Sequence, residues 1–293
     1  MSDQITTAFV KQYHGVVEFL LQQKGARLME TTRQESQNSE EQFWEQIGPT
    51  DAIEITTRHG DSPQVNTPHD RRRVTLKFFD WGDFIDQIDK VRMLIDPANP
   101  YAQNASYALG RKQDDIIIAA LFGTASTGKD GGTPIVFPAA QQVAANFGGA
   151  DSGLTVTKLI EAQRLLRVAE VDFDMEKPYI AVGAKQMANL LGTTQVTSAD
   201  FNSVKALVQG DVNSFMGMTF KHTERLLVDG SAKRRIPVWV KSGLLTAKNP
   251  EISTNIVQRW DKRGSWYVYA KMGMGAVRMQ EGKVVEIKCS ETV

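Results

Sequence analysis

The longest regular pattern of apolar positions in the chain predicts a single helix from Pro100 to Phe122. Small and apolar residues recur there at intervals of three and four, which is the spacing of one helix face. Asn99 suits the N-cap, Pro100 the first helical position and Gly123 the stop. A helix of this length spans about 35 Å. The predicted face comprises Tyr101, Ala105, Ala108, Leu109, Lys112, Ile116, Ala120 and Leu121.

Upstream of this helix, two alternating segments predict a two-stranded β-ribbon over residues 51–92. Every second residue is apolar, as in a strand with one buried face. The alternating residues are Ile53 and Ile55 in the first segment and Val74, Leu76 and Phe78 in the second. The stretch between them is polar, contains Gly60 and Pro63, and ends in the basic triplet Arg71–Arg73. Because a lone hairpin is marginal in water, we expect another surface to brace the ribbon.

The first 50 residues predict an arm. Their apolar residues cluster before residue 22, and the stretch from Glu30 to Gln42 is almost entirely polar. Residues 1–48 carry four basic and seven acidic side chains, a net charge of −3. A segment with so few apolar residues cannot bury itself, so we expect it to lie on another surface.

The second half of the chain mixes helix and strand patterns without a strict βαβ repeat. A helix is predicted over residues 155–171, with Thr157 as a possible N-cap, and a short one over "AKQMANLLG". Strands are predicted in "PYIAVG", "VNSFMGMTFKHTERL", "IPVWVKSGLLTA", "SWYVYAKM", "GAVRM" and "VVEIKCS", the last after a "QEGK" turn. This order favours the α+β class.

Charge and composition argue for a soluble protein with no general affinity for polyanions. The chain has 34 basic and 34 acidic side chains, so its formal net charge is zero. No stretch approaches the ~20 apolar residues that cross a bilayer, and the N-terminus lacks a signal-peptide pattern. The single cysteine, Cys289, cannot form an internal disulfide, and we expect it to be a small strand residue in a protein of a reducing compartment.

One short motif raises the possibility of nucleotide chemistry. Gly123 to Lys129 follows the G-x-x-x-x-G-K frame of a phosphate-binding loop. That loop requires a strand before it, a helix after it, and Ser or Thr after the lysine, whereas here a helix precedes it and Asp130 follows it. We therefore expect a flexible glycine-rich loop and keep a nucleotide-binding enzyme as an unfavoured alternative.

The remaining polar residues form no convincing catalytic centre. His59 with Asp61 and His69 with Asp70 loosely suggest a metal site, but solvated loop residues explain them better. No zinc-binding H-E-x-x-H, nucleophile elbow or dinucleotide fingerprint is present. Asp114 and Asp115 are adjacent, so on a helix they point about 100° apart and cannot act as a carboxylate pair. We expect no catalytic residue, cofactor or metal.

The order of these parts resembles the major capsid protein of tailed bacteriophages, which has the lambdoid-phage capsid architecture or Johnson fold. The resemblance covers nearly the whole chain. It is carried by the helix ending "ALFGTAST", by "LIEAQRLLRVAEVDFDMEKPYIAVGAKQMANLL", by "VNSFMGMTFKHTERL" and by "WYVYAKMGMGAVRMQEGKVVEIKC". It implies an N-terminal arm (1–50), an extended loop (51–92), a peripheral domain with the spine helix (93–154), an axial domain (155–250) and closing strands of the peripheral domain (251–293).

The resemblance also implies a function: a shell subunit that forms pentamers and hexamers of an icosahedral head, assembled in the host cytoplasm around double-stranded DNA, with a portal. The ribbon begins near residue 51, so no scaffolding segment of about a hundred residues fits, and a separate scaffolding protein or none is implied. Lysine is scarce in the ribbon, so we carry over no subunit cross-linking. The implied inter-subunit contact residues of the extended loop are Ile53, Ile55, Arg58, Arg71, Arg72, Arg73, Val74, Leu76 and Phe78. The residues named for the spine helix are Tyr101, Leu109, Ile116 and Leu121.

The closest alternative is an encapsulin-type nanocompartment, which shares this fold and encloses protein cargo. The Gln- and Glu-rich arm favours the phage interpretation. Net charge zero suits dense packing of many identical subunits, because self-repulsion would oppose it. We expect only weak, non-specific contact with packaged DNA, and no membrane contact.

Overall fold

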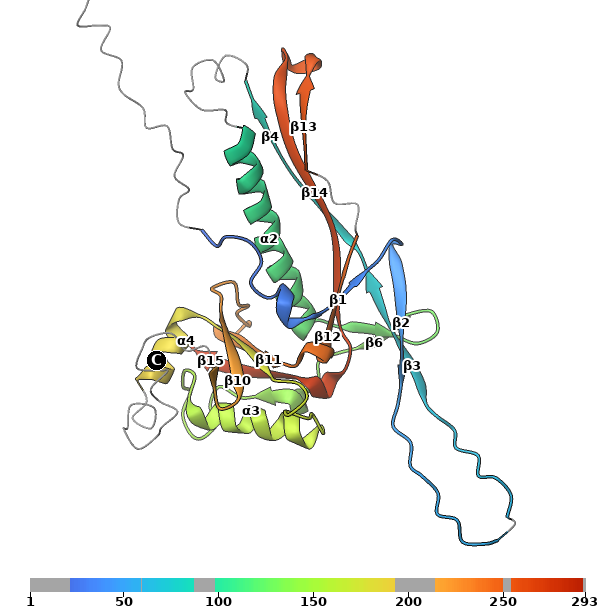
Figure 1. Ribbon diagram of the computed structural model, residues 1–293. Coiled ribbons are helices and arrows are strands. Elements are labelled where there is room, and N and C mark those ends of the chain that lie inside the picture. Colours follow the sequence, from blue (N-terminus) through green and yellow to red (C-terminus); the bar gives the residue numbers. More distant parts are fainter. Residues whose placement is uncertain (1–21, 59, 87–97, 193–213, 250–253, 292–293) are drawn as a thin grey trace, which may run out of the picture. The chain divides into compact units, whose positions relative to one another are not determined.

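The computed structural model describes residues 22–58, 60–86, 98–192, 214–249 and 254–291 (Figure 1). The chain divides into two compact units. Unit 1 comprises Met1–Ala26, Phe78–Lys112 and Glu251–Met272, and unit 2 comprises Arg27–Lys77, Gln113–Pro250 and Gly273–Val293. The apolar cluster expected in the arm before residue 22 lies outside the described residues. No helix in the described ranges is both long and apolar enough to cross a membrane.

Unit 1 is built on three neighbouring strands of a five-stranded sheet and on the first half of a long helix. Strands β4 (Lys77–Ile85) and β13 (Thr254–Arg259) both pair with β14 (Ser265–Arg278), and β13 runs antiparallel to it. Along β14, Val268, Ala270 and Met272 are buried, whereas Tyr267 and Tyr269 stack with ring centroids 5.5 Å apart. β14 is one continuous strand, although its sequence predicts two.

The long helix α2 (Ala98–Phe122) confirms the predicted helix. It begins before Asn99, so Asn99 is a helical residue and the predicted N-cap is wrong. The buried face is also displaced from the predicted one: Ile116 is half-buried and Lys112 is exposed. The fully buried side chains are Ala105, Asp114, Ile117, Ile118 and Leu121. A buried carboxylate, Asp114, lies on this face and disguises its period in the sequence.

Within unit 1, the arm crosses α2 at a glycine. A Cβ atom at Gly110 would lie 2.6 Å from the backbone of Gly25 and 2.7 Å from the amide nitrogen of Ala26. Arg111 Nη1 donates to Gln22 Oε1 at 2.6 Å, and Gln22 Nε2 donates to Asn104 at 3.3 Å. Glycine in a helix interior costs about 1 kcal/mol relative to alanine. At position 110 it lowers helix stability, but it leaves the space that the arm backbone occupies.

We expect Gly110→Val to displace the arm from α2. The added side chain meets backbone atoms, which cannot move aside as a flexible side chain can, and the loss of stability should be about 1–3 kcal/mol. The measurement is limited trypsin cleavage after Lys24 together with the melting temperature. Ser106→Val, on an exposed position of the same helix, is the control. Unchanged cleavage in Gly110→Val would show that the arm does not depend on this contact.

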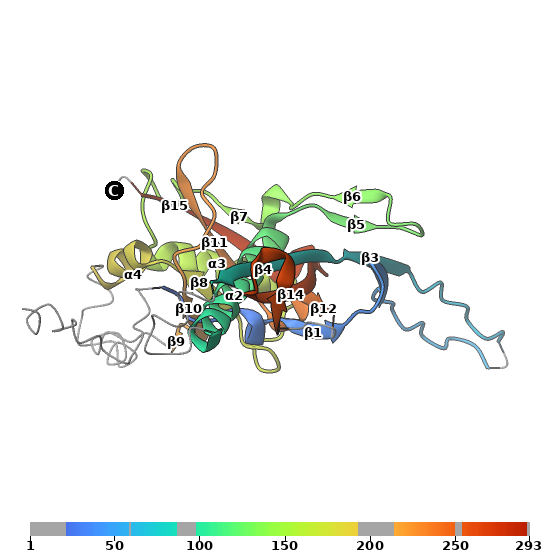
Figure 2. The same ribbon diagram turned by 90° about the horizontal axis from the view of Figure 1, so that it is seen from above.

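Unit 2 contains a six-stranded sheet in the order β7-β15-β11-β8-β10-β9 (Figure 2). The strands are β7 (Gln142–Val143), β8 (Tyr179–Val182), β9 (Ser214–Phe215), β10 (Met218–His222), β11 (Lys233–Trp239) and β15 (Val284–Ser290). Helices α3 (Val156–Val168) and α4 (Ala184–Leu191) confirm both predicted helices of this region. The N-cap of α3 is Thr155, whose hydroxyl accepts from Lys158 N, and the predicted Thr157 is wrong. Short 3-10 turns occupy Met29–Thr31, Ala139–Gln141, Lys241–Gly243, Trp260–Lys262 (in unit 1) and Glu281–Lys283.

The arm contributes to the core of unit 2 beyond residue 27. Strand β1 (Arg33–Ser36) pairs in parallel with β12 (Leu244–Lys248), which runs antiparallel to β14. Leu28 is fully buried, and its backbone N–H donates to the Asp114 carboxylate at 3.0 Å, as does that of Arg27. The arm therefore lies on another surface, as expected, and in this part that surface belongs to its own chain.

Cys289 is a buried residue of β15, which confirms its expected role as a strand residue. Burial raises the pKa of its thiol to about 12. The nearby Lys158 ammonium is also buried, donates to the carbonyls of Ser152, Gly153 and Lys288 at 2.8, 3.0 and 3.1 Å, and has a pKa lowered by desolvation.

We expect the Cys289 thiol to be inert in the folded protein. Only the thiolate attacks a disulfide reagent, and a pKa raised to about 12 keeps the thiol protonated throughout the neutral range. At pH 8 an aromatic disulfide reagent should label the chain only after urea unfolds it. Rapid labelling of the native protein would contradict the burial of this strand.

Candidate assembly site: the ribbon, its anchor and its tip

The ribbon is formed by strands β2 (Glu41–Ile47) and β3 (His69–Thr75), in the antiparallel register that pairs Trp44 with Arg72. The predicted first strand at Ile53 and Ile55 is wrong, because those residues lie in no strand. Strands β5 (Ala125–Thr127) and β6 (Thr133–Ile135) extend the sheet in the order β2-β3-β5-β6. The predicted flexible glycine loop is therefore a β-hairpin that braces the ribbon.

One face of the ribbon carries cross-strand ion pairs. Arg73 lies 3.3 Å from Glu41, and Arg71 lies 3.2 Å from Glu45. The Arg71 guanidinium also lies 5.8 Å from the ring centroid of Phe43. These groups are partly exposed, so each pair contributes little stability. They do favour the observed strand register, in which opposite charges face each other.

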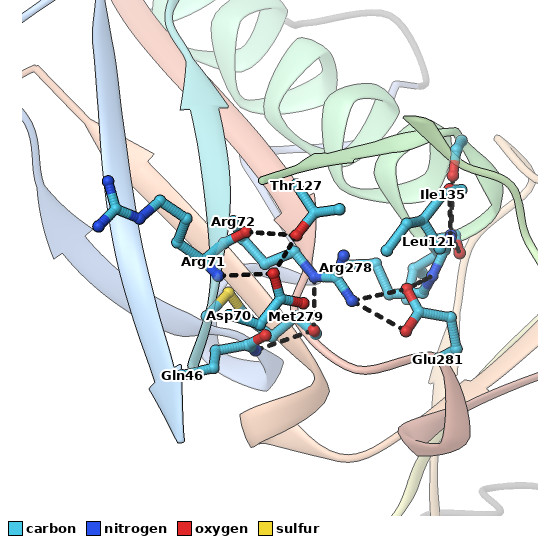
Figure 3. Close-up of polar contacts among 11 residues, drawn as sticks. Gln46, Asp70, Arg71, Arg72, Leu121, Thr127, Ile135, Arg278, Met279 and Glu281 are labelled. Atoms are coloured by element: carbon cyan, nitrogen blue, oxygen red, sulfur yellow. Dashed lines mark hydrogen bonds and ion pairs between the residues drawn. The ribbon is translucent and has the colours of Figure 1, made fainter. Parts of the chain in front are cut away.

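The other face of the ribbon packs on the rest of unit 2. Trp44 packs against a buried cluster of apolar residues from β3 through β14. Its members are Val74, Leu76, Ala125, Leu245, Ala247, Val277 and Met279. Gln46 Nε2 donates to the Met279 carbonyl at 2.9 Å (Figure 3). A Cβ at Gly275 would lie 2.5 Å from the Thr75 carbonyl oxygen, so β14 passes close against β3. The base of the ribbon is thus part of the unit 2 core.

Two buried arginines fix this base, and with Glu281 they form what we call the arginine anchor (Figure 3). Arg72 Nε donates to the Met279 carbonyl at 2.9 Å, and its Nη2 donates to both oxygens of Glu281 at 2.9 and 3.2 Å. Arg278 Nε lies 3.6 Å from the same carboxylate. Arg72 is 3% exposed and Arg278 is fully buried. Glu281 alone faces two guanidinium groups, so the anchor keeps a net positive charge.

Arg278 also terminates the long helix. Its Nη1 donates to the Leu121 carbonyl at 2.9 Å and to the Gly123 carbonyl at 2.8 Å, and its Nη2 donates to Ile135 at 3.3 Å. These bonds satisfy carbonyls that a helix end leaves without partners. Burial lowers the pKa of Arg278, and Glu281 counteracts that shift. One side chain therefore joins α2, the β5–β6 hairpin and β14.

The hairpin turn closes against the base of β3. The Thr127 hydroxyl donates to Asp70 and to the Arg71 carbonyl, the latter at 2.8 Å. The bond from Thr127 lowers the pKa of Asp70. An open cavity of about 330 Å³ lies beside them, lined by Glu45, His69, Asp70, Arg71, Gly128 and Lys129. Two carboxylates border this cavity, and a strand rather than a helix follows the glycines, so the arrangement differs from a phosphate-binding loop.

The tip of the ribbon, residues 49–67, projects beyond β2 and β3 (Figure 1). Every described residue of the tip is exposed. Ile55 is 88% exposed and Ile53 is 56% exposed. The tip carries the acids Asp51, Glu54 and Asp61 and one described base, Arg58. Loops of this length without secondary structure are uncommon in compact domains.

The structure divides the expected contact residues into two groups. Arg72, Val74 and Leu76 are buried in the core of their own chain, so their expected contact with a neighbour is wrong. Ile53, Ile55, Arg58, Arg71, Arg73 and Phe78 are exposed or partly exposed. In the helix, Leu121 is buried within unit 2, whereas Tyr101, Leu109 and Ile116 are half-buried. Sequence reasoning missed Arg278, Glu281 and Asp114, because charged residues are seldom buried.

Metal chemistry finds no support in the described residues, where no group of three potential ligands lies together. His59, one of the weighed histidines, lies outside those residues. Another histidine, His222, has protein partners for both ring nitrogens: its Nε2 lies 3.0 Å from Glu224 Oε1, and its Nδ1 lies 3.3 Å from Arg27 Nη1.

A buried base that carries an exposed, partly apolar tip is typical of a protein whose surface is covered by another molecule. A family model described as phage capsid protein matches residues 5–291. The chain therefore belongs to the phage capsid protein family and is a structural subunit of a phage head shell.

Solved capsid structures share the fold over nearly the whole chain. The capsid of cyanophage P-SCSP1u is 14% identical with a TM-score of 0.74, covering 98% of this chain and 94% of that chain. The cyanophage Pam1 capsid is 15% identical with a TM-score of 0.72, covering 97% of each chain. Mycobacterium phage Che8 gives 14% identity and a TM-score of 0.68, covering 95% of this chain and 97% of that chain. The comparison with curated proteins gave no match. The expected α+β capsid fold is thus confirmed.

Proposed function

We propose that the chain is the major subunit of an icosahedral head that encloses double-stranded DNA, and that the ribbon tip lies on a neighbouring copy. The observation that carries the contact is the exposure of Ile53 and Ile55 on a projection whose base is fixed by the arginine anchor. Apolar side chains held in water on a rigid support gain free energy when a second molecule covers them.

The geometry supports a head-to-tail contact between copies. In the proposed contact, the tip of one copy lies on a different part of the next copy, so the two copies contribute different surfaces. Contacts of this heterologous type generate rings when the rotation closes, as pentamers and hexamers require. The buried ribbon base orients the tip before assembly, which reduces the entropy lost on contact.

The finer roles of the segments belong to the same proposal. We assign residues 1–50 to the arm, 51–92 to the extended loop, 93–154 to the peripheral domain with the spine helix, 155–250 to the axial domain and 251–293 to the closing strands. The subunit acts without catalysis. A separate scaffolding protein and a portal act with it in the host cytoplasm, and contact with packaged DNA is non-specific.

Electron microscopy of particles purified from phage-infected cells tests the function. The proposal expects closed shells in which this chain is the most abundant protein and which protect double-stranded DNA from nuclease. Shells that contain packed protein and no DNA would instead identify an encapsulin-type compartment. Finding the chain in no particle would contradict a shell function.

A further inference from the structure

The turn between β13 and β14 in unit 1 exposes a tryptophan. Trp260 is 79% exposed, on a short 3-10 turn that spans Trp260–Lys262. Ile256 and Val257 on the adjoining strand are each 39% exposed. Among the described strands, β13 lies at the end of its sheet order, next to β14. An exposed aromatic residue beside an apolar edge strand is typical of a surface that another protein covers.

This turn is fixed before any partner arrives. Arg259 donates two hydrogen bonds of 2.8 Å to the Asp261 carboxylate, and this pairing lowers the pKa of Asp261 to about 2. Gly264 N donates to the Arg259 carbonyl at 3.1 Å, and Gln258 Nε2 donates to the Gly264 carbonyl at 3.1 Å. Arg263 has a φ of 52°, a left-handed conformation that is uncommon outside glycine. A pre-organised turn loses little entropy when it binds.

The charge of the turn indicates the kind of surface that it contacts. Arg259 and Asp261 neutralise each other, and Lys262 and Arg263 beside Trp260 form no ion pair with the residues that the structure describes. The ribbon tip of the same chain has the opposite character. It exposes Ile53 and Ile55 and carries three acids against one described base. The turn presents apolar side chains beside positive charge, and the tip presents apolar side chains beside negative charge. The two surfaces are therefore complementary in charge.

We propose that Trp260 is an anchor residue that docks on the ribbon tip of a second copy of this chain, with Lys262 and Arg263 facing the acidic side chains of that tip. Buried aromatic anchors edged by complementary charge dominate the binding energy of many interfaces. The inference rests on the proposed shell function and names the surface that receives the tip.

The test uses the full chain under conditions in which wild type forms particles. Trp260→Ala should fold normally and reduce the yield of sedimenting particles at least about tenfold, the loss expected for a central aromatic anchor. Trp260→Phe should retain part of the yield. Met175→Ala, at an 83% exposed apolar residue of unit 2, is the matched control and should assemble as wild type does. Wild-type yield from Trp260→Ala would overturn the inference.

Charge reversal identifies the receiving surface. Lys262→Glu combined with Arg263→Glu should block assembly, and so should Asp51→Lys combined with Glu54→Lys. Combining all four substitutions in one chain should restore particles, because every reversed tip then meets a reversed turn on its neighbour. If the fourfold variant folds and still does not assemble, the ribbon tip is not the partner of this turn.

A fluorescence measurement reports on the burial of Trp260 itself rather than on particle yield. The acrylamide-accessible fraction of tryptophan emission should fall when wild-type subunits assemble, and this fall should shrink in Trp260→Phe. An unchanged fall in Trp260→Phe would overturn the inference. Failure of wild type to form any particle would instead contradict the proposed function, so the two failures are distinguishable.

Discussion

Replacing Arg278 by methionine is expected to lower the free energy of unfolding by about 3–5 kcal/mol, the cost of breaking a buried charged network from one side. The side chain is fully buried and donates to the carbonyls of Leu121, Gly123 and Ile135. Methionine has a similar length but no donors, so these carbonyls lose their partner. Glu281 keeps only Arg72. Urea unfolding followed by tryptophan fluorescence measures the change.

The matched control is Arg164→Met. Arg164 also pairs with a glutamate, at 2.7 Å from Glu161, but it is exposed on α3. Exposed pairs contribute about 0–1 kcal/mol, so this variant should unfold almost as wild type does. If both variants lost the same small amount, the arginine anchor would not be what holds the ribbon base, and the account of a rigid support for the tip would be wrong.

Replacing residues 49–67 by Asn-Gly is expected to leave a folded subunit that no longer assembles. Gly48 N donates to the Pro68 carbonyl at 2.9 Å, so the two strands are already close enough for a two-residue turn. The described residues removed are all exposed and none belongs to the buried cluster. Particle yield should fall about tenfold or more, while the melting temperature stays near that of wild type.

A deletion that extended to residue 72 would remove most of β3, including Arg72, and should unfold the base of the ribbon. Val136→Ser, at a 70% exposed apolar residue outside the tip, controls for the loss of surface apolar area. Normal assembly of the Asn-Gly variant would contradict a role for the tip in subunit contact.

The existence of the long helix and of most elements of the second half follows from sequence because their apolar patterns extend over several turns or a whole strand. In α2 and α3 the apolar spacing runs over three turns or more, and β8 is a continuous apolar run between punctuating residues. Local patterns of this kind need no knowledge of what packs against them.

Strand β2 could not be predicted from its apolar pattern in the same way. Phe43 and Trp44 are neighbours in sequence, so the strand places an aromatic ring on each face and shows no alternation. Conversely, Ile53 and Ile55 alternate as a strand would, but no strand among the described residues pairs with them. Strand patterns depend on what covers each face, and for the tip we infer that this surface belongs to another copy.

The buried charges are the second failure of sequence reasoning. Asp114 accepts from two backbone N–H groups of the arm, and Arg278 donates to three carbonyls, so both bond to backbone atoms far away in sequence. No local pattern marks such residues. Two separate strands were predicted in this stretch, whereas Gly275 admits the Thr75 backbone and β14 continues through it as one strand.

The most direct test of the central claim is a cryo-electron microscopy reconstruction of the assembled particle. The account predicts a closed shell built from copies of this chain, in which residues 49–67 of each copy lie on a neighbouring copy and the arginine anchor holds the base of the ribbon in its own subunit. A shell in which those residues face solvent and contact no neighbour would contradict it.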